Sequence, residues 1–163
     1  TTISSFYILN PDNSTLLASP EINNNSPIQR SGSSIIITKD NQLYLFGGYI
    51  KHPNYSQLLL TRQFYHFNFT SNQWIDLTYT TDEAKIPPSA YHTATLIEDR
   101  YMVILGGSIN LLNEDGRILY NNITNELNKP FNLIYLFDIQ LLTWKKIIIN
   151  NAPTEARIGH TTT

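Results

Sequence analysis

The feature that most constrains this chain is an internal repeat whose landmarks recur in a fixed order. A glycine pair closes an apolar run twice, in the sequences LYLFGG at 43–48 and MVILGG at 102–107. An aromatic-rich run ending in Asn or Asp is followed six residues later by Trp74 in one copy and by Trp144 in the other. Several landmarks in one order are more specific than any of them alone, so the chain is built from repeated units.

Each copy begins with a short lead-in segment, RSGS at 30–33 and SAYH at 89–92, whose first residue precedes the glycine pair by 17 residues. Flanking residues fit further copies, because 6–16 matches the end of an earlier unit with Leu16 in place of the Trp, and 157–160 (RIGH) matches another lead-in. We expect the outer strands of a preceding unit at 1–20, complete units at 30–77 and 89–149, and the start of a fourth unit at 157–163.

Short runs rich in Ile, Tyr, Phe, Thr and Trp, separated by tight polar turns, predict four β-strands in each complete unit. No stretch shows helical periodicity with caps. The fold class is therefore all-β, with four-stranded antiparallel sheets divided between Leu77 and Ser89. Strands are expected near 34–38, 42–46, 62–69 and 73–77 in the first unit, and near 92–97, 101–105, 133–138 and 143–148 in the second.

This order of features resembles the kelch repeat, in which an Arg-x-Gly-His-like lead-in precedes a strand closed by Gly-Gly, a Tyr-x-x-Asp-like strand and a strand with a Trp. The resemblance covers essentially the whole chain and implies a divergent β-propeller fragment of about two and a half blades. The departures are Ser89 for Arg, Ser33 for His, Leu16 for Trp and Asn68 for Asp. The pattern is carried by Gly47, Gly48, Trp74, Gly106, Gly107, Asp138, Trp144, Arg157, Gly159 and His160.

The glycine pairs and the tryptophans have a physical explanation in a radial fold. Glycine accepts a positive φ and lets another backbone approach closely, which suits the crowded region near the axis. Trp74 and Trp144 are large enough to fill the wider gap between blades further out. Neither glycine pair lies in the Gly-x-Gly-x-x-Gly or Lys-Ser/Thr pattern of a phosphate loop.

Loop length differs between the two ends of the predicted blades. The links between strands 1 and 2 and between strands 3 and 4 are short, whereas the other end carries 49–61, 78–88, 108–132 and 150–154. Long loops on a rigid scaffold are typical binding elements. In kelch relatives the same face commonly holds the partner site, so the resemblance implies a protein partner there. The candidate contact residues are Tyr49, His52, Tyr55, Arg117, Tyr120 and Asn122.

Catalytic chemistry has little support in the sequence. No His-Glu-x-x-His motif, clustered metal spacing or Gly-x-Ser-x-Gly elbow occurs, and His92 and His160 stand at matching repeat positions. We therefore expect a non-catalytic scaffold without a metal or cofactor. Two alternatives stay open. One is a galactose-oxidase-like copper enzyme with its ligands on blades outside this chain, and the other is an extracellular carbohydrate-binding propeller.

Charge and composition exclude other classes of partner. Charged residues make up 15% of the chain and the formal net charge is −2, without a basic stripe for nucleic acid. No apolar run approaches the roughly 18 residues of a membrane span, so no membrane contact is expected from this segment. The chain has no Cys. The compartment stays open between cytoplasmic and, if the Asn-x-Ser/Thr sequons are used, extracellular; these are Asn13, Asn24, Asn54, Asn68 and Asn122.

Overall fold

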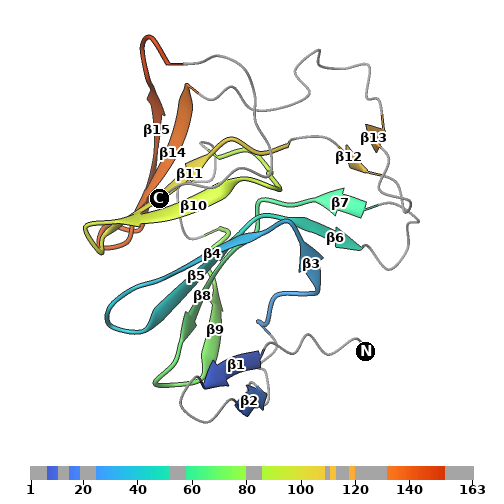
Figure 1. Ribbon diagram of the computed structural model, residues 1–163, viewed down its shortest axis with the longest axis vertical. Helices are drawn as coiled ribbons and strands as arrows, with labels where there is room; N and C mark the ends of the chain where they lie inside the picture. The colour runs from blue at the N-terminus through green and yellow to red at the C-terminus, as the bar shows by residue number, and fades with distance from the viewer. Residues whose placement is uncertain are drawn as a thin grey trace.

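The computed structural model describes residues 7–10, 15–18, 25–51, 58–79, 86–108, 111–112, 118–119 and 132–152. All fifteen elements in these ranges are β-strands (Figure 1). The predicted all-β class with four-stranded antiparallel sheets is therefore confirmed. Within the same ranges there is no helix long and apolar enough to cross a membrane.

Two four-stranded antiparallel sheets form the body of the chain, and we call them the first and the second blade. The first blade has the order β4 (Ser34–Ile37), β5 (Gln42–Phe46), β8 (Phe64–Asn68) and β9 (Gln73–Asp76). The second has the order β10 (Thr93–Ile97), β11 (Tyr101–Leu105), β14 (Leu133–Asp138) and β15 (Thr143–Ile148). A separate antiparallel pair consists of β1 (Tyr7–Asn10) and β2 (Thr15–Ala18).

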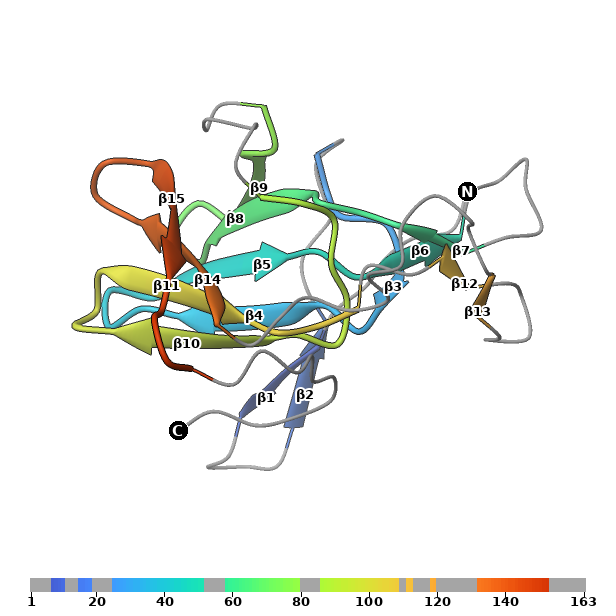
Figure 2. The same ribbon diagram turned by 90° about the horizontal axis from the view of Figure 1, so that it is seen from above.

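The two blades lie side by side, in contact at their first strands and further apart at their last strands. Their first strands, β4 and β10, contact each other, and Figure 2 shows these strands running side by side. The last strands, β9 and β15, lie far apart in Figure 1. The first strand of each blade is therefore its inner strand, and the gap between the blades widens toward the outer strands.

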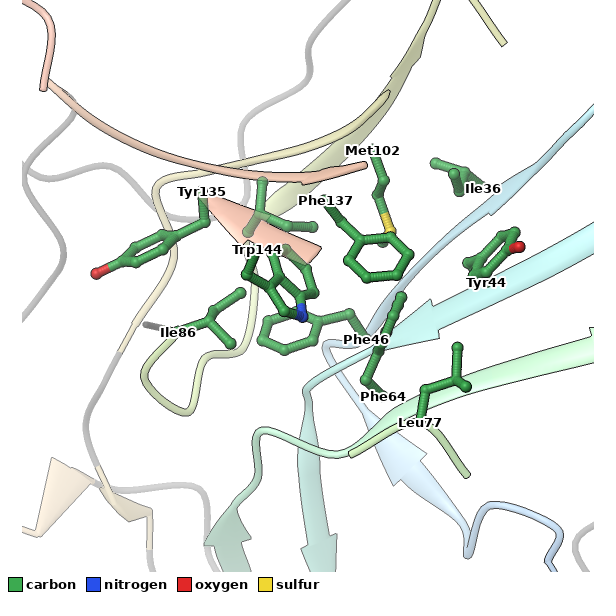
Figure 3. Close-up of a cluster of buried hydrophobic side chains, with 11 residues drawn as sticks. Ile36, Tyr44, Phe46, Phe64, Leu77, Ile86, Met102, Tyr135, Phe137 and Trp144 are labelled. Atoms are coloured by element: carbon green, nitrogen blue, oxygen red, sulfur yellow. The ribbon is translucent and has the colours of Figure 1, made fainter. Parts of the chain in front are cut away.

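Strand alternation supplies the core between the blades. Along β5 the side chains of Tyr44 and Phe46 face the second blade, whereas Leu43 belongs to a different cluster on the opposite face. Figure 3 shows the side chains that fill the gap. This inter-blade cluster consists of Ile36, Tyr44, Phe46, Phe64, Leu77, Ile86, Met102, Ile104, Tyr135, Phe137 and Trp144.

The repeat tryptophans occupy equivalent places in the two blades. Trp144 packs against Phe137 of its own blade at a ring-centroid distance of 4.9 Å, and against Phe46 and Phe64 of the first blade at 5.6 and 5.2 Å. Trp74 packs against Phe67 at 5.0 Å, in the buried cluster on the far face of the first blade. The tryptophan of a blade thus lies on the face directed away from the blade that follows it.

The structure corrects the expectation that 49–61 and 108–132 are plain loops. Both segments contain short strands that join a third sheet, which we call the insertion sheet. Its order is β13 (Ile118–Leu119), β12 (Leu111–Leu112), β7 (Leu58–Leu60), β6 (Tyr49–Lys51) and β3 (Arg30–Ser31). Strands of two or three residues are too short to show a period in the sequence, and their partners lie far apart along the chain.

Candidate interaction face

The insertion sheet joins the strand 2–3 insertions of both blades into one structure. In the first insertion Lys51 pairs with Leu58, and in the second Leu112 pairs with Ile118. Leu58 also pairs with Leu112, and this contact connects the two hairpins across the blades. Figure 1 shows the five strands grouped at one end of the molecule. A ligand at this end therefore meets a paired sheet that spans two repeats.

A hollow of about 450 Å³ lies beside the edge strand of the insertion sheet. Four consecutive residues, 28–31, form part of its lining, and the register places Tyr49, Lys51 and Leu58 on a common face of the sheet. The hollow combines aliphatic side chains with hydroxyl, amide and cationic groups, which is a composition suited to peptide contacts. Its lining consists of Ile28, Gln29, Arg30, Ser31, Tyr49, Lys51 and Leu58.

Arg30 is held rigidly at the wall of this hollow. Its Nη1 donates to the Gly47 carbonyl at 3.1 Å and its Nη2 donates to Gln63 Oε1 at 3.0 Å. Its Nε donates to the Ile28 carbonyl at 3.1 Å, and the guanidinium lies 5.0 Å from the centre of the Tyr65 ring. Burial lowers the pKa of Arg30 from its ordinary value, although neighbouring Tyr65 acts in the opposite direction. These contacts fix a side chain that would otherwise have many rotamers.

The first glycine pair lets the second blade approach the first. Gly48 N donates to the Ser89 carbonyl at 2.8 Å, and Gly47 N donates to the Gln63 carbonyl at 3.0 Å. Gly47 has a φ of +70°, and a Cβ there would lie 2.3 Å from the Ser89 carbonyl oxygen. No side chain fits in that space. The glycine therefore allows a hydrogen-bonded contact between the two repeats.

Tyr49 is not the exposed loop residue that the sequence predicted. It is 1% exposed, and its ring centroid lies 5.9 Å from that of Tyr91. Burial raises the pKa of Tyr49 above its ordinary value, and a hydrogen bond with Ser108 partly offsets this effect. Tyr49 therefore packs beneath the face and lines the hollow. The predicted site and pattern residues that fall outside the described ranges are His52, Tyr55, Arg117, Tyr120, Asn122, Arg157, Gly159 and His160.

His92 connects the two blades at the same end. Its side chain is 6% exposed, and its Nε2 lies 2.6 Å from Ser34 Oγ at the start of β4. Its ring also packs against Phe46 at a centroid distance of 5.2 Å. In the part of the chain that the structure describes, no three His, Asp or Glu side chains are grouped so that they could hold a metal ion.

The order of these features along the chain matches one known family over its whole length. The family model named KLHDC2/KLHL20/DRC7 Kelch-repeats domain matches residues 1–163. The chain belongs to the Kelch-repeat family. Among solved structures, that of YjhT is similar to this Kelch-repeat chain with a TM-score of 0.62 at 13% identity, covering 93% of this chain and 46% of YjhT. The chain thus spans less than half of YjhT, and the likeness concerns the fold. No curated protein sequence matches the chain significantly.

Sequence reasoning missed one exposed residue of this Kelch-repeat face. Tyr91 stands in the lead-in segment at the position that Gly32 and Gly159 hold in the other copies. It has a φ of +55° and is 41% exposed. The signal was present in the sequence, because a large side chain at a glycine position is visible once the repeats are aligned.

Proposed function

We propose that this chain is a non-catalytic scaffold that binds a protein partner through the face carrying the insertion sheet. Kelch-repeat propellers commonly mediate protein interactions, and the chain belongs to that family over its full length. The insertions distinguish one end of the blades from the other. At the opposite end, turns as short as 38–41 and 139–142 join consecutive strands.

The observation that carries this proposal is the pairing of Leu58 with Leu112. Flexible loops lose conformational entropy when they bind, and this loss weakens the complex. Strands that are already paired have undergone that ordering within the folded protein. The insertion sheet therefore offers a preorganised surface that extends over two repeats, with the hollow at its edge.

The contacts expected on this face come from both insertions. His52 and Tyr55 stand between β6 and β7, Arg117 between β12 and β13, and Tyr120 and Asn122 after β13. Tyr and Arg are frequent anchors in protein interfaces because they combine large contact area with directional hydrogen bonds. In this proposal Tyr49 supports the surface from below and does not contact the partner.

The described histidines have structural contacts, which favours a scaffold over an enzyme. His92 Nε2 lies against Ser34 Oγ, and His66 Nε2 lies 2.6 Å from Gln42 Oε1 while its ring stacks on Tyr44 at 4.9 Å. Both imidazoles thus have defined packing partners between or within the blades.

The test is affinity capture with the intact protein, comparing the wild type with two shortened variants. One variant replaces 52–57 by Asn-Gly, which fits a two-residue hairpin turn after the Lys51–Leu58 pair. The other replaces 113–117 by Asn-Gly after the Leu112–Ile118 pair. Both changes keep the paired strands, and loop length itself has a small effect on stability. We expect at least one shortened variant to lose the partner.

Controls at the opposite end distinguish a local effect from a general one. Lys39→Ala and Gln140→Ala change exposed side chains in the short turns, and we expect them to retain the partner. Partner capture that survives both shortened insertions would place the binding site elsewhere. Equal loss in the controls would show that capture does not depend on this face.

A further inference from the structure

A large side chain occupies a strained backbone position on the proposed binding face. Seven described non-glycine residues have a positive φ. Apart from Tyr91, five of them lie in the short turns that join consecutive strands of a blade, and Asn151 lies in the turn that follows β15. Tyr91 lies in the lead-in to β10, where the other repeats have glycine. Aromatic residues seldom adopt this conformation, because their Cβ is too close to the backbone.

The surrounding structure holds Tyr91 in place. Its N–H donates to the Gly32 carbonyl at 2.7 Å, which joins the lead-in segments of the two blades. Gly32 has a φ of +66°, and a Cβ there would lie 3.0 Å from the Tyr91 ring. The backbone hydrogen bond requires only the main chain of residue 91, so a glycine would make it equally well and without strain.

The ring of Tyr91 lies on the proposed binding face, at the margin next to the inner strands β4 and β10. Gly32 and Tyr91 precede β4 and β10, the two inner strands, at the same end as the insertion sheet. The ring packs on Tyr49, which in turn lines the hollow. One side is therefore supported, while 41% of the residue is exposed. A supported and partly exposed tyrosine has the properties of an interface anchor.

We infer that Tyr91 is a contact residue for the protein partner, which presents an apolar or aromatic side chain to its ring. This inference rests on the proposed function and adds a residue outside the insertions. Strained residues are retained where the surrounding structure imposes them for a functional reason. Here glycine would make the same backbone hydrogen bond, so the benefit of the tyrosine lies in its ring, which is partly exposed on the proposed face.

The test combines Tyr91→Gly with a matched control, Leu142→Gly, in the intact protein. Leu142 also has a positive φ, +53°, and is 44% exposed, but it lies in the turn between β14 and β15 at the opposite end. Thermal unfolding and the Kd for the captured, purified partner are measured for each variant. Tyr91→Asn is a second variant, because Asn tolerates the left-handed conformation.

We expect both glycine variants to unfold at the same temperature as the wild type or a higher one, because strain is removed. The Kd should rise at least about tenfold for Tyr91→Gly and Tyr91→Asn and stay unchanged for Leu142→Gly. A lower unfolding temperature in both Tyr91 variants would assign the ring to packing and overturn the inference. An unchanged Kd would also overturn it.

The outcomes separate this inference from the proposed function. If the shortened insertions abolish binding while Tyr91→Gly binds normally, the binding face is retained and only the role of Tyr91 is rejected. If the wild type captures no partner, or if both shortened variants bind normally, the proposed function fails and the inference fails with it.

Discussion

Arg100 and Asp138 form an ion pair that ties the β10–β11 turn to the end of β14. Arg100 Nη2 lies 2.7 Å from Asp138 Oδ2, and its Nε donates to Oδ1 at 3.1 Å. Asp138 Oδ1 also accepts hydrogen bonds from the N–H groups of Gln140 and Leu141. In the first blade Asn68 makes the equivalent turn contacts. The Asp138 carboxylate thus forms an ion pair and also accepts the hydrogen bonds of the turn, whereas the Asn68 amide oxygen accepts the hydrogen bonds of its turn.

Substituting Asp138 should separate these two contributions. Asp138→Asn keeps an oxygen that caps the turn but loses the ion pair, whereas Asp138→Ala loses both. We expect the alanine variant to unfold at lower denaturant concentration than the asparagine variant, and both below the wild type. Chemical unfolding of the intact protein at pH 7 measures this order. Equal midpoints for the two variants would show that the turn contacts contribute nothing.

The same ion pair should make folding acid-sensitive. The hydrogen bond from Arg100 lowers the pKa of Asp138 below its ordinary value of 3.8. This contribution is fully present above the unfolded-state pKa and is lost as the pH falls through the lower folded-state pKa. Between pH 7 and pH 2 the wild type should lose more stability than Asp138→Asn. A steeper loss in the variant would contradict the assignment.

The glycine at position 47 should tolerate no side chain. Gly47→Ala places a Cβ 2.3 Å from the Ser89 carbonyl oxygen at a φ of +70°. We expect a loss of about 2–4 kcal/mol in the free energy of unfolding, measured by denaturant titration. Gly32→Ala is the matched comparison at a similar φ of +66°, because its Cβ would lie 3.0 Å from the Tyr91 ring and 3.2 Å from the Tyr91 backbone nitrogen, which is a much milder overlap. An equal loss in the two variants would contradict this account.

Trp144 should contribute strongly to the contact between the blades. It is 2% exposed and lies among aromatic rings of both blades. Trp144→Ala leaves a large cavity and should cost about 3–5 kcal/mol of stability. Trp144→Phe should recover part of this loss. Near-ultraviolet circular dichroism and unfolding midpoints follow both variants, and a midpoint unchanged in Trp144→Ala would show that the blades are held by other contacts.

His66 provides a second test of pH dependence, in a milder range. Burial lowers the pKa of His66 below its ordinary value of 6.5, although Asp40 partly opposes this effect. The neutral form therefore favours the folded state, and stability is lost as the pH falls from above 6.5 through the folded-state pKa. His66→Gln removes this titration, so the stability difference between pH 7.5 and pH 5.5 should shrink. A larger difference in the variant would contradict this prediction.

The sequence predicts the blades well because their signals are local. The 17-residue spacing from Arg30 to Gly47 reflects one strand, one tight turn and another strand, and the structure has β4 and β5 there. Each pairing in a blade joins consecutive strands along the repeat. Fixed spacing therefore translates directly into register, and the predicted strands agree with the observed ones to within a few residues.

The insertion sheet could not be predicted in the same way. Leu58 and Leu112 pair although 54 positions separate them, and the strands on either side are only two or three residues long. Short apolar runs such as 58–60 have no period that distinguishes strand from loop. Tyr49 was expected at the surface for the same reason, because only the pairing of β6 with β3 and β7 shows which way it faces.

Because β7 pairs with β12, the insertion sheet is complete only when two adjacent repeats are present. A repeat protein gains or loses length by duplication or deletion of single repeats. A single copy of either repeat carries only part of the insertion sheet, and its strands would be left with an unpaired edge. The proposed binding surface is therefore a property of two adjacent repeats, and we expect a transplant into another propeller to succeed only when both are moved together.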